Sequence, residues 1–432
     1  MNDLLRRVDW LFVAILMVIT GFYVWGVRGV PFHPDETSLL YQSADLEVFL
    51  TDPISLAWEP SKTAEKDQVY RTLNPPVPKI ILGIGRRLAG YGPETVAVDW
   101  DWSESWDVNR ERGALPDERL LVSARLANVV LLAFSLVLIY LSGLRVGGRL
   151  TGIAGALLLG VNALVLLHGR RAMAEGALVF GVSLAILGLT LARDRPWLTG
   201  VGAATAVLSK LSAGALFPVG LAVVAWPEKM DRSSLRKAAI RSLMYLGAFL
   251  GEIVFLEPLL WRHPLEALSA VWRTRLDFSS AQVELFGALA PSQVLHSPLQ
   301  RLASLIGNTF IAPPQFAEVG NYVSQMAPQV GDYLAIPGHA MLRGVFGGGV
   351  IFMLTLAGIG LAALRFQRRP STARFALASL AVGFVAQALS LYAAISLPFQ
   401  RFYIPLIPFI CLWAGYALGS VINLTRLQPS AR

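Results

Sequence analysis

The chain has 432 residues, of which 54% are hydrophobic and 15% are charged, and its mean hydropathy is +0.54. Soluble globular proteins typically carry about 25% charged residues, so this composition excludes a soluble protein and indicates an integral membrane protein. The net charge of +8 arises mainly in short basic loops, a pattern typical of topology signals rather than of nucleic-acid binding. The single cysteine, Cys411, excludes a disulfide framework within the chain and a multi-cysteine metal site.

The first apolar run covers residues 10–27 and follows Arg6 and Arg7, which predicts an uncleaved anchor helix with a cytoplasmic N-terminus. Residues 31–119 then form a polar segment that holds 16 of the 29 acidic residues. Loops of this length are usually functional. Within this first outer segment, the apolar stretch 77–88 is too short to span a bilayer and predicts an interfacial helix on the outer leaflet.

The remaining apolar runs alternate with short basic turns. A single span over residues 199–226 would place the basic residues that follow it outside, against the positive-inside rule. Two short segments that turn near Lys210 restore the alternation and put this lysine at the outer face. The alternative is one tilted span with a snorkelling lysine. The other predicted spans are residues 120–144, 150–168, 176–192, 241–261, 343–364, 375–397 and 402–422.

These runs predict an all-α polytopic membrane protein. We expect one transmembrane domain over residues 1–432, with about ten spanning helices and both termini in the cytoplasm. Residues 262–342 are expected to form a second outer segment with only weak amphipathic stretches. The expected location is the plasma membrane.

Two adjacent carboxylates, Asp35 and Glu36, lie just past the first predicted helix, at its outer end. Pro31 and Pro34 restrict the backbone around them. A carboxylate held in this place can accept a proton from an incoming hydroxyl group. The competing interpretation is structural, because an Asp shortly before a helical run beginning near Thr37 would also be a good N-cap.

Glu175 is a third candidate, in a short predicted outer turn between two apolar runs. Together with Asp35 it would form a pair of carboxylates from two separate loops, which can divide the roles of base and acceptor positioning. The alternative is a local salt bridge to the neighbouring Arg170 or Arg171.

A phosphate group at a membrane surface is typically held by a cluster of cations. For any single cation, snorkelling towards the headgroups is the common alternative, so the cluster indicates more than its members do. His33, His168 and His263 are scattered and lack metal-ligand spacing, so a divalent metal is compatible with the pattern but not indicated by it. No other cofactor is predicted. The basic residues expected at the outer face are Arg71, Lys79, Arg170, Arg171, Lys210, Arg262 and Arg401.

Six short stretches follow one another in a characteristic order. They are residues 32–36 (Phe-His-Pro-Asp-Glu), 72–79 (Thr-Leu-Asn-Pro-Pro-Val-Pro-Lys), 124–126 (Ala-Arg-Leu), 168–175 (His-Gly-Arg-Arg-Ala-Met-Ala-Glu), 208–210 (Leu-Ser-Lys) and 400–408 (Gln-Arg-Phe-Tyr-Ile-Pro-Leu-Ile-Pro). In this order the chain resembles the GT-C membrane glycosyltransferases over nearly its whole length. The likeness is to the group that holds the protein O-mannosyltransferases and the aminoarabinose transferases of lipid A.

The resemblance implies a GT-C-type bundle with interfacial helices in the first outer segment. It also implies a polyprenyl-phosphate-linked sugar as donor, transfer on the extracytoplasmic side, and inversion at the anomeric carbon by direct displacement. Asp35 would be the general base, Glu36 its supporting partner, and Glu175 a positioning group for acceptor or donor sugar. The cations that would hold the phosphate leaving group are Lys79, Arg171, Lys210 and Arg401.

The chain departs from the family pattern at two positions. Asn74 stands where the group has Lys or His, and Glu175 replaces a more usual Asp. The acceptor is left open as a protein, a lipid or a growing glycan. Two other functions compete with the enzyme interpretation: a transporter or flippase for lipid-linked glycans, and a non-catalytic assembly subunit with the same fold. A transporter should show paired half-sequences and ionisable residues near the middle of the membrane, for which Glu252 is the best candidate.

Overall fold

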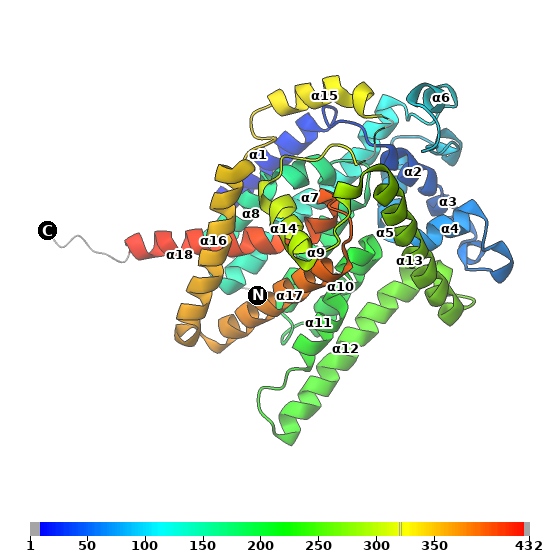
Figure 1. Ribbon diagram of the computed structural model, residues 1–432. Helices are drawn as coiled ribbons and strands as arrows, with labels where there is room; N and C mark the ends of the chain where they lie inside the picture. The colour runs from blue at the N-terminus through cyan, green and yellow to red at the C-terminus, as the bar shows by residue number, and fades with distance from the viewer. Residues whose placement is uncertain (1–8, 319, 321, 427–432) are drawn as a thin grey trace.

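The computed structural model of the chain describes residues 9–318, 320 and 322–426, so the predicted cytoplasmic marker residues Arg6 and Arg7 lie outside the described residues. Throughout the described ranges the secondary structure is helical, without a β-strand (Figure 1). The all-α prediction is therefore confirmed.

Five helical segments are long and apolar enough to cross a membrane in the part of the chain that is described. α18 (Ile407–Arg426) is largely buried among its neighbours, whereas α12 (Arg232–Leu256) exposes most of its surface. Such a difference is expected when one helix lies in the centre of a bundle and the other faces lipid. The other three are α7 (Glu118–Val146), α16 (Gly344–Arg365) and α17 (Ser371–Ala394).

Shorter apolar helices complete the bundle, and they fall where apolar runs were predicted. They are α1 (Trp10–Gly26), α8 (Arg149–Gly160), α9 (Ala174–Thr190), α10 (Pro196–Ser209) and α11 (Leu216–Ala225). The count of about ten membrane-spanning helices stays a prediction, because several of these helices are shorter than a bilayer requires.

The predicted break at Lys210 is confirmed. α10 ends at Ser209 and is followed by Lys210, whose backbone is extended (φ −163°, ψ 132°); α11 begins six residues after this lysine, at Leu216. Small residues let α10 approach α9 closely: a Cβ on Gly202 would lie 2.6 Å from the backbone nitrogen of Ala185. This close contact fixes the position of the break beside the start of α9.

The first outer segment folds into short helices around α5 (Pro76–Leu88), so the predicted helix over residues 77–88 is confirmed. α5 packs on α7 through Gly85, where a Cβ would lie 2.9 Å from the Cβ of Ala127. The other helices of this segment are α2 (Pro34–Gln42), α3 (Asp45–Thr51), α4 (Lys66–Leu73) and α6 (Trp106–Glu111).

The second outer segment is more regular than the sequence predicted. It contains α13 (Pro264–Leu289), α14 (Pro298–Ile306) and α15 (Val323–Ala335). In Figure 1, α13 begins near the end of α12 and turns away from it, and it packs beside α4. α13 is 26 residues long, and the sequence analysis gave no bounds for such a continuous helix.

Candidate active site

Asp35 lies in the first turn of α2, but its side chain does not cap this helix. The N-cap is His33, whose Nδ1 accepts a hydrogen bond from the Asp35 backbone N–H (3.1 Å). Pro34 occupies the first helical position, which moves the cap one residue upstream of it. The alternative interpretation of Asp35 as the N-cap is therefore wrong.

The carboxylate of Asp35 is 28% exposed and forms an ion pair with Arg401. Its other close neighbour is the His33 ring, whose Nδ1 lies 3.9 Å from Oδ2 of Asp35. Burial by itself would raise the pKa of Asp35, but Arg401 and His33 outweigh it and hold this pKa below its usual value. Asp35 is thus ionised at neutral pH.

Glu36 is fully buried and satisfied by three partners. Its two oxygens accept a bidentate pair of hydrogen bonds from Arg125, both 2.7 Å long. The backbone N–H groups of Ala172 (2.7 Å) and His33 (3.0 Å) donate to the same carboxylate. Burial would raise the pKa of Glu36, but Arg125 dominates and lowers it. Glu36 therefore joins α2 to α7 and to the turn before α9.

Glu175 is buried at the start of α9 and pairs with Lys210, with 2.5 Å between Oε1 and Nζ. Its other oxygen, Oε2, has no hydrogen-bond partner among the described residues. The alternative of a local salt bridge to Arg170 or Arg171 is wrong, because both arginines point elsewhere. The extended backbone at Lys210 is what lets the lysine reach Glu175 from the neighbouring helix.

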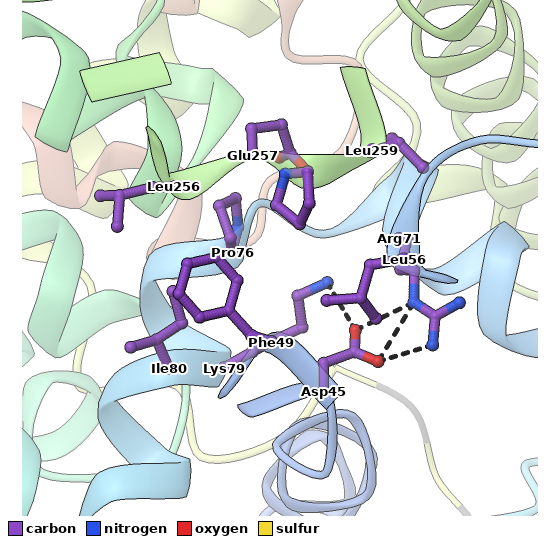
Figure 2. A pocket seen from close by; sticks show the side chains of 11 residues that line it. Asp45, Phe49, Leu56, Arg71, Pro76, Lys79, Ile80, Leu256, Glu257 and Leu259 are labelled. Atoms are coloured by element: carbon purple, nitrogen blue, oxygen red, sulfur yellow. Dashed lines mark hydrogen bonds and ion pairs between the residues drawn. The ribbon is translucent and has the colours of Figure 1, made fainter. Parts of the chain in front are cut away.

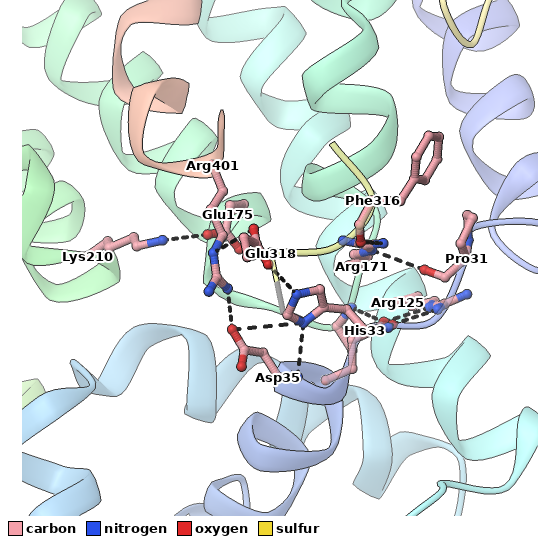
Figure 3. Close-up of polar contacts among 12 residues, drawn as sticks. Pro31, His33, Asp35, Arg125, Arg171, Glu175, Lys210, Phe316, Glu318 and Arg401 are labelled. Carbon is pink, nitrogen blue, oxygen red and sulfur yellow. Dashed lines mark hydrogen bonds and ion pairs between the residues drawn. The ribbon is translucent and has the colours of Figure 1, made fainter. Parts of the chain in front are cut away.

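Arg401 connects these groups. It binds Asp35 and also pairs with Glu318, with 3.2 Å between Nε and Oε1. Glu175 lies within electrostatic range of Arg401, and Lys210 sits over the ring of Phe402 at 5.6 Å. Figure 3 shows Asp35, Arg401, Glu318, Glu175 and Lys210 in one continuous group. We call these five residues the acid–cation array.

Glu318 was missed by the sequence analysis. Its Oε2 lies 2.7 Å from Nε2 of His33. Because Nδ1 of His33 accepts a hydrogen bond from a backbone N–H, the ring proton is assigned to Nε2, which donates a hydrogen bond to Glu318. Burial would raise the pKa of Glu318, but Arg401 and His33 lower it. One signal was available, because Glu318 and Asp332 are the only acids in residues 290–342.

Arg171 is buried beside the array but its contacts are to backbone. It donates to the carbonyl oxygens of Pro31 (3.0 Å) and Phe316 (2.9 Å), while its Nη1 has no hydrogen-bond partner among the described residues. These contacts tie the first outer segment to the second. Arg125, which anchors Glu36, belongs to the Ala-Arg-Leu stretch noted at residues 124–126, but no role was predicted for it.

Lys79 lies in a separate pocket. Its Nζ is 3.4 Å from Asp45, which also binds Arg71 through bonds of 2.7 to 3.2 Å. Glu257, the residue that follows the end of α12, lines the same pocket (Figure 2). Burial raises the pKa of Glu257 to about 7, although Lys79 opposes the shift. Lys79 is thus separated from Arg171, Lys210 and Arg401, the other three cations predicted to hold a phosphate, which lie in or beside the acid–cation array.

A further cation, Arg275 on α13, was also missed. It is half-buried and forms no ion pair with any described residue. Burial and the nearby Arg401 lower the pKa of its guanidinium, and it is also within electrostatic range of Lys210. The side of α13 that carries Arg275 therefore lies near the acid–cation array. There the arginine adds a positive charge that has no ion-pair partner among the described residues. No group of three or more His, Cys, Asp or Glu residues in the described ranges is arranged to hold a metal ion.

The helical bundle and the array at its outer segments define a polytopic membrane protein with the GT-C fold. Residues 68–256 match the family described as dolichyl-phosphate-mannose-protein mannosyltransferase, which covers less than half of the chain. A search of the curated proteins found no sequence that matches this chain. The resemblance noted from the sequence is confirmed by this match and by solved structures.

Two solved structures illustrate the shared fold. The Archaeoglobus fulgidus oligosaccharyltransferase AglB, in complex with an inhibitory peptide and a dolichol-phosphate, aligns with a TM-score of 0.52 and 12% identity over 97% of this chain and 51% of that one. ArnT from Cupriavidus metallidurans, bound to undecaprenyl phosphate, aligns with a TM-score of 0.50 and 17% identity over 97% of this chain and 60% of that one. The chain therefore spans about half to three fifths of the length of these proteins.

Proposed function

We propose that the protein is an inverting glycosyltransferase that moves a sugar from a polyprenyl-phosphate donor to a hydroxyl acceptor at the extracytoplasmic face of the plasma membrane. The observation that carries this proposal is the acid–cation array, in which Asp35 and Glu175 come from separate outer turns and share one group of cations. The family match supports a sugar-transfer function. The structural neighbours support a polyprenyl-phosphate ligand, since two of them are complexes with such lipids.

In this proposal Asp35 removes the proton from the acceptor hydroxyl group. The acceptor oxygen then bonds to the anomeric carbon, while the bond from that carbon to the phosphate oxygen breaks and the phosphate leaves with the electron pair. A single displacement of this kind inverts the anomeric centre. Negative charge grows on the phosphate as the bond breaks, so fixed cations stabilise the transition state more than the ground state.

Arg401 has a double role in the proposal. Without donor it neutralises Asp35 and makes this carboxylate a weaker base, because its charge lowers the pKa of Asp35. A donor phosphate competes with Asp35 for the guanidinium. Donor binding therefore restores the basicity of Asp35 at the moment when the base is needed.

The other candidates take supporting roles. Lys210 and Arg275 add positive charge beside Arg401 for the phosphate. Lys79 would contact the donor from its separate pocket. Glu175, with one oxygen that has no partner among the described residues, positions the acceptor or the sugar, and Arg171 and Glu36 hold the backbone on which Asp35 sits. The acceptor is a protein, lipid or glycan hydroxyl group.

The transporter alternative has less support. Its best residue, Glu252 on α12, accepts a hydrogen bond of 2.7 Å from Thr205 on α10. This is a polar contact between packed helices, and it accounts for the acid without any transport pathway.

The test is transfer by the purified chain in vesicles, with polyprenyl phosphates carrying hexoses or pentoses and with peptide, lipid and glycan acceptors. Asp35→Asn should lower kcat about 10²- to 10⁴-fold, the usual contribution of a general base. Asp107→Asn, an exposed acid in the same outer segment, is the matched control and should retain full turnover. Undiminished transfer by Asp35→Asn would exclude the role of Asp35, and cargo movement without sugar transfer would favour the transporter.

A further inference from the structure

α13 has three distinct faces over residues 264–277. Successive residues on an α-helix are turned by about 100°. Ala267, Ala270, Val271 and Thr274 form the side that faces the protein, and all four are buried or half-buried. The two remaining sides are both exposed, but they differ completely in chemistry.

One exposed side is apolar. Leu265, Leu268, Trp272 and Leu276 follow one another at helical spacing and are 80%, 52%, 69% and 50% exposed. We call these four residues the apolar strip. Four large apolar side chains left uncovered on one strip form a surface that soluble proteins avoid.

The other exposed side is charged, and we call it the charged strip. Its residues, Glu266, Arg273 and Asp277, are turned roughly 115° from the apolar strip by the geometry of the helix. A helix whose exposed surface is divided in this way fits a boundary between water and an apolar phase.

The neighbouring helix α12 indicates that the apolar phase is the lipid bilayer. α12, a candidate membrane span, exposes Val254 (59%) and Phe255 (67%) in its last turn. Only seven residues separate its end at Leu256 from the start of α13 at Pro264. Between them Trp261 is partly exposed and its indole N–H donates to the carbonyl of Val254 (2.6 Å), a position typical of a tryptophan at headgroup level.

We infer that α13 lies along the outer surface of the bilayer, with the apolar strip inserted among the lipid chains of the outer leaflet and the charged strip in water. The apolar surface of α12 then continues directly into that of α13. Arg275 lies between the apolar strip and the protein-facing side, so this placement holds its guanidinium at headgroup depth. The inference concerns membrane contact and does not depend on the proposed sugar transfer.

The test uses the full chain in lipid vesicles, with a fluorophore attached at Leu268→Cys on the apolar strip or at Asp277→Cys on the charged strip. The native Cys411 is buried, and unmodified protein checks that it does not react. Nitroxide on the lipid chains should quench the label at position 268 severalfold more than the label at 277, and aqueous iodide should do the reverse.

A second measurement avoids labelling. Brominated lipids should quench the tryptophan emission of the native chain more than that of Trp272→Phe. Equal access of iodide to both labels would overturn the inference by placing α13 in water. Protection of position 268 from lipid and water alike would also overturn it, by showing that protein, such as a second copy of the chain, covers the strip.

Discussion

Arg401 binds the carboxylate of Asp35 across 366 residues of sequence. The contact joins the first outer segment to the turn that leads into α18. The same guanidinium pairs with Glu318, so three separate parts of the chain meet on one cation. A change in Arg401 should therefore alter the pKa of Asp35 and, under the proposed function, the binding of the donor phosphate.

Arg401→Gln should lower kcat about 10²- to 10³-fold, the typical effect of removing one group that stabilises developing charge. It should also raise the pKa of Asp35, because the native cation holds this pKa below its usual value. The acid limb of the kcat/KM profile, which reports the free enzyme, should therefore move to higher pH. Arg112→Gln, at an exposed ion pair with Asp101, is the control. An acid limb that stays in place would show that Arg401 does not control Asp35.

The Glu175–Lys210 pair gives a second prediction. Both side chains are largely removed from solvent, so Glu175→Gln or Lys210→Gln leaves a buried charge without its partner and should destabilise the protein by about 3–5 kcal/mol. The double variant should recover part of this loss, which a double-mutant cycle of unfolding measurements would detect. Lys62→Gln, at the exposed pair with Glu65, should change little. Strictly additive single effects would mean that the two residues are not coupled.

Local patterns in the sequence were sufficient for most helices. Apolar runs of helical length located α1, α7, α9, α16 and α17 to within a few residues. The break at Lys210 followed from charge parity across the membrane, which is a property of loops and not of the helices themselves. α13 was missed because its three faces mix apolar, charged and small residues, so no single periodicity dominates.

The site was predicted in its residue types but not in its pairings. Asp35 and Glu36 are adjacent in sequence, yet one pairs with Arg401 and the other with Arg125. Nothing in a single sequence specifies partners so distant, because register between loops is set by the folded bundle. Asp35 was weighed as the N-cap of α2 because it precedes the helical run that begins near Thr37, whereas Pro34 at the first helical position makes His33 the cap.

Glu36 gives a prediction about stability. Glu36→Gln removes the charge that pairs with the buried Arg125 and should cost about 3–5 kcal/mol at neutral pH. The pKa of Glu36 is lower in the folded chain than in the unfolded chain, so its contribution is present above the unfolded value of about 4.3 and is lost as the pH falls through the folded value. The native chain should therefore lose more stability on acidification than Glu36→Gln does. Thermal inactivation curves of the two proteins should converge in acid, and curves that stay parallel would contradict the prediction.

Glu257 gives the last prediction, which concerns donor binding near neutral pH. Burial raises its pKa to about 7, so in the pocket of Lys79 and Asp45 it is neutral below this pH and negative above it. A new negative charge beside Lys79 opposes a phosphate group. Between about pH 6 and about pH 8 the donor KM should therefore rise roughly 3- to 10-fold, the effect of about 1 kcal/mol of repulsion. Glu257→Gln should remove this rise, while Glu266→Gln, an exposed acid on α13, should preserve it. If the KM of Glu257→Gln climbs with pH as steeply as that of the native chain, the titrating group lies elsewhere and the pocket of Lys79 is not on the donor's path.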